Sequence, residues 1–160
     1  MRKHPEVDTI EDVVTFRLNL LVAIEERAGQ HWSERLFDLS MNEWRLLALI
    51  KSRGPCRASD LADLLLMDKS QTSRSIKVLL KKKLILNLPD VKDGRAVTLE
   101  LTETGKVQYD QVFAEVLESN ERILSVLNSK EVAMFDSVLR KLVSHSQDLL
   151  ERRLGRQLVR

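Results

Sequence analysis

The sequence predicts a mostly α-helical protein with a minor β component, arranged as a winged helix-turn-helix between long N- and C-terminal helices. Apolar residues recur at spacings of three and four through most of the 160 residues, which is the periodicity of amphipathic helices. Two short helical segments flank a tight break at Met67-Asp68 and precede a hairpin turn signal at Asp93-Gly94. Only 4% of the residues are aromatic and only 5 are Gly, a composition that suits helices.

The composition narrows the class of protein. A chain of this length with 43% hydrophobic residues is expected to form one domain with a sizeable core. The single cysteine, Cys56, excludes an intramolecular disulfide and is typical of a reducing compartment. No segment resembles a signal peptide or a membrane span, so we expect a soluble, cytoplasmic protein.

The N-terminal third predicts two helices. The first is expected over about residues 7–28, because Ile10, Val14, Leu18 and other apolar residues form one stripe. Residues 29–39 are expected to be irregular or to form a short helix. Residues 40–43 then make a capping box that begins a central, largely apolar helix, which ends at Arg53-Gly54-Pro55.

A helix-turn-helix and a hairpin are predicted in the middle of the chain. The first helix covers residues 58–66, and Asp68 is placed to cap the second helix, residues 69–83. Strands are expected at about residues 84–88 and 96–101, the second because apolar and polar residues alternate in it.

Two long helices complete the chain. One begins near Thr102, and the other follows a break and a new cap at residues 128–131. The first and last helices of the protein carry more apolar surface than a small winged part can cover. Exposed stripes of this kind usually mark interfaces.

Charge is segregated along the sequence, although the net charge is only +2. The segment from Lys51 to Arg95 contains 11 Lys and Arg against 5 Asp and Glu, whereas the remainder contains 15 against 19. A basic middle between acidic-leaning ends indicates a polyanionic partner for the middle.

The helix expected at residues 69–83 carries the candidate contacts to DNA. It has six basic residues and no acidic one, and we expect its first turn to expose Ser70, Gln71 and Thr72. In a helix-turn-helix this end enters the major groove, where Gln can pair with adenine and Arg with guanine. The lysines further along, including Lys82 and Lys83, would neutralise phosphates. An ordinary solvated basic helix is the alternative. The predicted contacts are Lys69, Ser70, Gln71, Thr72, Arg74, Ser75, Lys77 and Lys81.

The hairpin is expected to act as a wing beside this helix. A wing tip can reach the adjacent minor groove, whose negative potential attracts arginine, and Arg95 is the candidate for insertion. Asp93 is close enough in sequence to hold its guanidinium in a forked pair, and Lys92 adds a positive charge. A solvated surface pair is the alternative.

The run from Leu61 to Gly105 resembles the DNA-binding core of MarR-type bacterial transcription regulators. The likeness lies in SRSIKVLLKKKLI, in Asp-Gly-Arg at residues 93–95 and in LTETG, and SMNEWRLLALI upstream extends it over nearly the whole chain. Gly94 stands where the family often has an arginine. The resemblance implies a homodimer held by the N- and C-terminal helices. Its two recognition helices, about 34 Å apart, would favour a pseudo-palindromic site.

The resemblance also implies a repressor released by a small aromatic or phenolic acid, bound between the dimerisation helices and the winged part. Arg17 lies on an apolar stripe and needs a counter-ion, so it is the first candidate for the ligand carboxylate, with a carboxylate across the dimer as the alternative. His31, Trp44 and Arg45 could line the same crevice. The alternatives are that His31 is a surface residue, that Trp44 is a core residue and that Arg45 forms a structural ion pair.

Two other functions remain open at this point. Oxidation of Cys56 would make the chain a thiol sensor, although Arg57 alone is a weak source of thiolate character. A winged-helix module that docks on acidic proteins would use the same basic helix. An enzyme is not expected, and neither is a cofactor or a metal, because the sequence has no Gly-rich phosphate loop and no metal-ligand spacing.

The expected organisation is one domain over residues 1–160. Residues 40–101 would form its winged DNA-binding part, and residues 1–39 and 102–160 its dimerisation helices.

Overall fold

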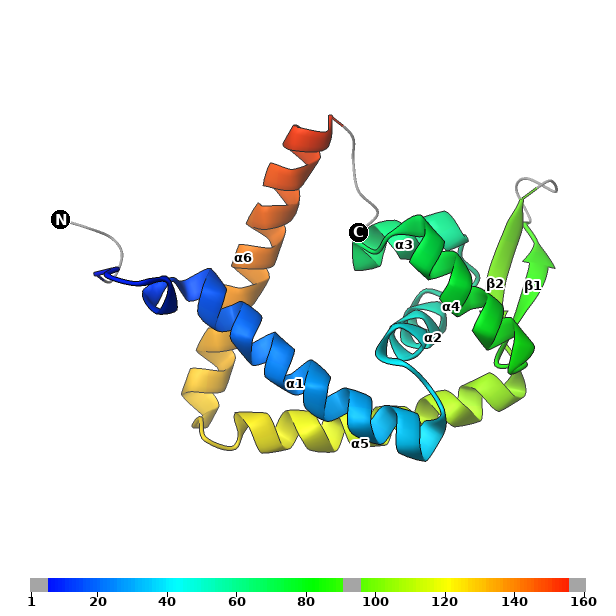
Figure 1. Ribbon diagram of the computed structural model, residues 1–160, viewed down its shortest axis with the longest axis horizontal. Coiled ribbons are helices and arrows are strands. Elements are labelled where there is room, and N and C mark those ends of the chain that lie inside the picture. Colours follow the sequence, from blue (N-terminus) through cyan, green and yellow to red (C-terminus); the bar gives the residue numbers. More distant parts are fainter. Residues whose placement is uncertain (1–5, 91–95, 156–160) are drawn as a thin grey trace.

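The computed structural model describes residues 6–90 and 96–155 (Figure 1). It confirms the mostly helical winged helix-turn-helix expected from the sequence. The elements in chain order are η1 (Ile10–Asp12), α1 (Val14–Phe37), α2 (Met41–Arg53), α3 (Ala58–Leu65), α4 (Lys69–Lys81), β1 (Ile85–Pro89), β2 (Val97–Leu101), α5 (Glu103–Leu124) and α6 (Ser129–Leu154).

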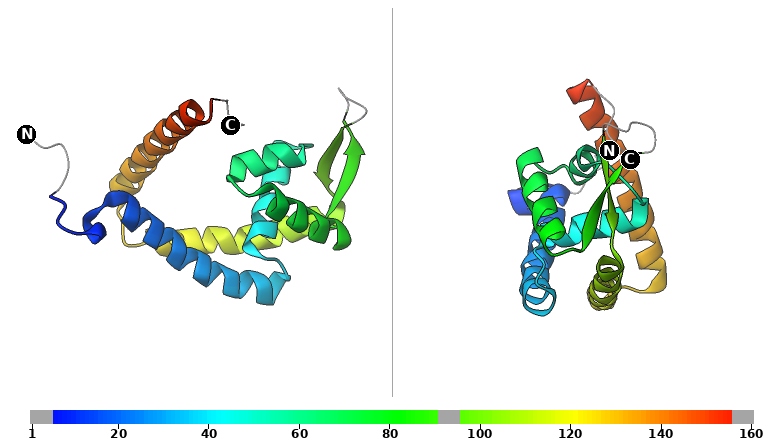
Figure 2. Two further views of the ribbon diagram at one scale, coloured as in Figure 1. Left: turned by 45° about the horizontal axis from the view of Figure 1, so that its top comes forward. Right: turned by 90° about the vertical axis from the view of Figure 1, so that its right-hand side faces the viewer.

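The elements are arranged as a winged part with long helices extending from it. Helices α2, α3 and α4 and the β1–β2 hairpin gather at one end, while α1 and α5 lead away from them and α6 turns back from the far end of α5 (Figures 1 and 2). The hydrophobic core lies almost entirely in the winged part. Its members are Leu39, Trp44, Leu46, Leu47, Ile50, Leu61, Ile76, Leu79, Leu84, Ile85, Leu99, Leu101 and Val112.

The helix starts follow the predicted caps. The Ser40 hydroxyl accepts the Glu43 N–H at 3.3 Å, and the Glu43 carboxylate accepts the Ser40 N–H at the same distance. Asp68 caps α4, and Asn128 with Glu131 forms another capping box at α6. Local side-chain oxygens satisfy the first N–H groups of α2, α4 and α6, which is why these boundaries are readable from sequence.

The prediction that residues 29–39 are irregular or form a separate short helix is wrong, because α1 continues unbroken to Phe37. Gly29 is buried inside α1, and a Cβ there would lie 3.3 Å from the sulfur of Met41. The glycine therefore marks a close approach of α1 to the start of α2. The helix ends instead at Asp38, whose φ is 52°.

The hairpin is antiparallel, with Ile85 opposite Leu101. Cys56 extends it as an isolated bridge, donating its N–H to the Leu99 carbonyl at 3.2 Å and accepting the Leu99 N–H at 2.9 Å. The predicted alternation holds at Leu99 and Leu101, which are buried, and fails at Val97, which is 53% exposed. Val97 begins the strand at the end of the hairpin that projects beyond the helices (Figure 1).

Within the described ranges, no helix is long and apolar enough to cross a membrane. No group of three or more His, Cys, Asp or Glu side chains in those ranges is placed to hold a metal ion.

Candidate nucleic-acid interface

Helix α4 presents a polar and basic face to solvent. Its start is fixed by Asp68, whose carboxylate accepts the N–H groups of Ser70 at 2.8 Å and Gln71 at 3.2 Å. Its opposite face packs into the core through Ile76 and Leu79. Because α4 contains no acidic residue, the exposed face is neutral or positive throughout. The exposed side chains are Lys69, Ser70, Gln71, Ser73, Arg74, Lys77 and Lys81.

Thr72 and Ser75 do not belong to this face. Thr72 is 2% exposed and donates its hydroxyl to the Asp68 carbonyl at 3.0 Å, and Ser75 is 8% exposed. Both lie at helical spacing from Leu79 and share its inward direction. The expectation that the first turn of α4 exposes Thr72 is therefore wrong, because a helix packed on a core exposes only part of each turn, and the contact of Thr72 and Ser75 with DNA stays a prediction that their burial does not favour.

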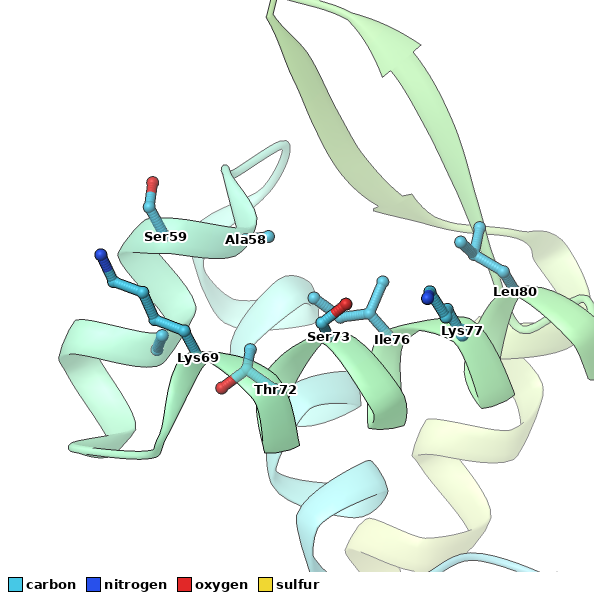
Figure 3. A pocket seen from close by; sticks show the side chains of 9 residues that line it. Ala58, Ser59, Lys69, Thr72, Ser73, Ile76, Lys77 and Leu80 are labelled. Carbon is cyan, nitrogen blue, oxygen red and sulfur yellow. The ribbon is translucent and has the colours of Figure 1, made fainter.

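A cavity of about 430 Å³ opens between α3 and α4 (Figure 3). Lys69, Ser73 and Lys77 line it from α4 at successive spacings of four, and Ser59 lines it from α3. Figure 3 shows the Lys69 and Ser59 side chains reaching the same end of the cavity. The other lining residues are Ala58, Ala62, Thr72, Ile76 and Leu80.

Ser59 and Ser73 are two exposed polar residues that the sequence prediction missed. Ser73 could have been found, since it falls midway between Lys69 and Lys77 on one line of the helix. Ser59 could not, because nothing in the sequence of α3 shows that its first turn faces α4.

The wing tip, with the predicted contacts Lys92, Asp93 and Arg95, lies outside the described residues. The base of the wing is well defined: the Asp90 N–H donates to the Ala96 carbonyl at 2.9 Å. Arg57, at the start of α3, holds the Asp90 carboxylate through Nε at 2.8 Å and Nη2 at 2.7 Å. This two-nitrogen contact ties the direction of the wing to α3.

Lys82 differs from its neighbours on α4. Its ammonium is engaged by oxygens of Asp38 and Glu43 rather than free for a phosphate. The expectation that it acts in the same way as Lys81 is not supported, since Lys81 is exposed and Lys82 is half-buried.

Arg17 and His31, two of the predicted ligand contacts, have partners on their own helix or just before it. The Arg17 guanidinium donates to the Glu11 carbonyl at 2.6 Å and to the Asp12 carboxylate at 3.1 Å. The His31 ring lies 3.1 Å from the guanidinium of Arg35. Both side chains are exposed.

Trp44 and Arg45 have different partners from Arg17 and His31, and different partners from each other. Trp44 is 6% exposed and stacks on Tyr109 with ring centroids 5.6 Å apart, so it is a core residue. Arg45 forms an ion pair with Glu26. The structure therefore does not bring the four predicted ligand contacts together, and none of them lines the cavity between α3 and α4.

The surroundings of Cys56 disfavour a thiolate, the form that a redox sensor needs. Burial, and next the negative charge of Asp60, raise the pKa of its thiol, whereas Arg53 lowers it by less. A sensor cysteine requires the opposite shift.

Comparison with known proteins agrees with this geometry. Residues 39–97 match the model of the MarR family. The HTH-type transcriptional repressor MdtR of Bacillus subtilis (strain 168) is 26% identical over 102 residues, an alignment that covers 64% of this chain and 66% of MdtR, just under two thirds of that relative.

Solved structures extend the likeness to nearly the whole chain. A MarR/EmrR family transcriptional regulator from Acinetobacter sp. ADP1 has a TM-score of 0.79 and 25% identity, over 88% of this chain and 99% of its own. S. aureus MepR, solved as a complex with DNA, has a TM-score of 0.75 and 19% identity, over 87% of this chain and 100% of its own. The winged helix-turn-helix described above is thus similar to that of the MarR family, whose model matches residues 39–97, and its fold is that of the solved MarR-type structures.

Proposed function

We propose that the chain is a homodimeric transcriptional regulator that binds a specific double-stranded DNA sequence. The observation that carries the proposal is the exposed face of α4, where short and amide side chains precede a line of lysines on a helix whose other face is buried. The MepR–DNA complex, a structural neighbour, supports the choice of DNA as the polyanion.

The side chains divide by position along α4. Ser70, Gln71 and Arg74 are exposed in its first two turns, where they can reach base edges in the major groove. Lys69, Lys77 and Lys81 would neutralise phosphates, together with the wing residues. Lys92, Asp93 and Arg95 remain in the proposal, supported by the Arg57–Asp90 contact that joins the base of the wing to α3.

The exposure of α6 supports the dimer, since none of its 26 residues is buried. The N-terminal half of α1 also exposes Leu20, Leu21 and Ile24. Apolar surface of this extent needs a cover, and a second copy supplies one that matches it. Residues 40–101 would then bind DNA and the flanking helices would assemble the dimer. The exposed apolar residues of α6 are Met134, Phe135, Val138, Leu139, Leu142, Val143, Leu149 and Leu154.

Repression and release by a small aromatic acid complete the proposal. The similarity to MdtR, a repressor by name, supports the first. For the second, the cavity between α3 and α4 offers an apolar floor with Lys69 and Lys77 at its rim, which suits an aromatic carboxylate. An acid bound there would compete with DNA directly.

The proposal is tested by selecting DNA sites from a random pool with the purified protein. We expect a pseudo-palindrome, bound with a log–log salt slope near −7 for about 8 phosphate contacts, and weaker binding in the presence of salicylate. No sequence preference and a shallow slope would instead identify a protein-interaction module. Selective binding that ignores salicylate would retain the regulator and remove the acid.

A further inference from the structure

The ammonium of Lys82 is surrounded by three oxygens at the junction of α1 and α2. It donates to the Asp38 carbonyl and, at 3.2 Å, to the Glu43 carboxylate, and it lies 3.2 Å from the Asp38 carboxylate. An ammonium has three N–H groups, so the number of oxygens equals the number of donors. Lys82 is the C-cap residue of α4, the helix proposed to read DNA.

The three contacts differ in how much they contribute to holding the Lys82 ammonium in place. The Asp38 side chain is 92% exposed, and an ion pair so open to water contributes little. The Glu43 side chain is only 12% exposed and is already held by the N–H of Ser40 in the capping box. Glu43 is therefore a fixed, desolvated acceptor, and with the Asp38 carbonyl it defines where Lys82 can lie.

The same junction satisfies the end of α1. The last carbonyls of a helix have no partner within it, and here two successive ones are bound by side chains from elsewhere. Gln108 of α5 donates to the Phe37 carbonyl at 3.0 Å, and Lys82 donates to the Asp38 carbonyl. A cation at this end also complements the helix dipole. The end of α1 is thus joined directly to the end of α4.

We propose that Lys82 is a positioning residue that sets the angle between α1 and α4. The consequence rests on the proposed function: if α1 helps to form the dimer, this angle sets the separation of the two recognition helices. Lys81 and Lys82 then have different roles despite identical charge, since Lys81 contacts phosphates and Lys82 pairs with Glu43.

The geometric part is tested without DNA, by pulsed electron paramagnetic resonance on the full chain. Spin labels are placed on Ser70→Cys in a Cys56→Ser background, and the distance between the two protomers is measured. We expect one narrow distribution for the parent and for Lys81→Met, and a broadened or displaced one for Lys82→Met. Parent-like distributions for Lys82→Met would overturn the proposal.

Glu43→Gln provides a second variant that does not depend on Lys82→Met folding. Glutamine also serves at this position of a capping box, so α2 keeps its start while Lys82 loses its charged partner. The distance distribution should broaden as it does for Lys82→Met. A parent-like distribution for Glu43→Gln would remove Glu43 from the mechanism and overturn the proposal.

The functional part uses the site selected from random DNA, and copies with one base pair added or removed between the half-sites. The preference of Lys82→Met for the selected spacing over the altered spacings should fall about tenfold, and its salt slope should equal that of the parent. Lys81→Met should keep the preference and flatten the slope by about 1.8, or about 0.9 per chain.

A flattened slope with intact spacing preference in Lys82→Met would make Lys82 a phosphate ligand and overturn the positioning role. Absence of any DNA preference in a parent that still dimerises would refute the proposed DNA recognition, whereas the spin-label distances between its protomers would still decide what Lys82 does.

Discussion

The α-carbon of Gly105 lies directly against the backbone of Leu84, so that a Cβ on Gly105 would be 1.9 Å from the Leu84 carbonyl oxygen. Thr102 holds the same junction: its hydroxyl donates to the Lys83 carbonyl at 2.7 Å and accepts the Gly105 N–H at 2.9 Å. The sequence LTETG therefore docks the first turn of α5 on the turn that ends α4.

Replacing Gly105 by Ala should destabilise the protein. Alanine would add about 1 kcal/mol of helix propensity, but its methyl group would meet a backbone oxygen that cannot move without displacing the end of α4. We expect a net loss of about 2 kcal/mol or more in the free energy of unfolding, measured by urea denaturation. Thr104→Ala, at the exposed neighbour, is the control and should stay within about 0.5 kcal/mol. Equal stability of the two variants would contradict the close contact.

Replacing Arg74 by Ala should relax sequence specificity. Arg74 is exposed on the second turn of α4, where a guanidinium can donate two hydrogen bonds to guanine. We expect a loss of about 1–3 kcal/mol of discrimination at one base pair of each half-site, measured by competition binding with single-base variants of the selected site. Lys77→Ala is the comparison, and it should weaken all sequences about equally. An unchanged base preference in Arg74→Ala would remove Arg74 from base recognition.

Replacing Leu142 by Glu should convert the proposed dimer to a monomer. Leu142 is 43% exposed in the middle of the apolar stripe of α6, and in a dimer it would place a carboxylate in a dry interface. Analytical ultracentrifugation should show the change. Ser144→Glu adds the same charge about 200° further around the helix and should remain dimeric. If both variants stay dimeric, α6 does not form the interface.

The thiol of Cys56 should stay protonated at neutral pH. Burial and the nearby Asp60 carboxylate raise its pKa, so alkylation by iodoacetamide should accelerate only as the pH rises above the ordinary thiol range of about 8.5. Mass spectrometry of the alkylated chain gives the midpoint, and Asp60→Asn should lower it. A midpoint below that range in the parent would restore the thiol-sensor hypothesis.

Local chemistry explains which features were predictable from sequence. The caps at Ser40, Asp68 and Asn128 depend on residues two or three positions away, so a single sequence contains both partners. The hairpin, the helix-turn-helix and the exposed Ser70 and Gln71 are likewise set by spacing and turn residues.

The predictions failed where contacts with another element determine the local structure or the exposure of a residue. Gly29 resembles a helix breaker, and only the approach of Met41 shows why α1 accepts it. Thr72 lies in the first turn of the recognition helix, where sequence predicts contact with bases, and only the packing of α4 shows that its side chain is buried. Arg17 seemed to lack a counter-ion because the predicted continuous helix would keep Asp12, five residues away, off its face, whereas η1 and the extended Val13 bring the Asp12 carboxylate to 3.1 Å.

If α6 forms the proposed dimer, its exposed apolar surface makes folding depend on the protein concentration. A helix with no fully buried residue in its own chain would gain most of its stabilising contacts by meeting a second copy, so the folded fraction would depend on total concentration. Dilution should lower the melting temperature, and below the dissociation constant newly made chains would be exposed to proteases. The fraction of assembled regulator would therefore rise steeply with its own expression, without any ligand.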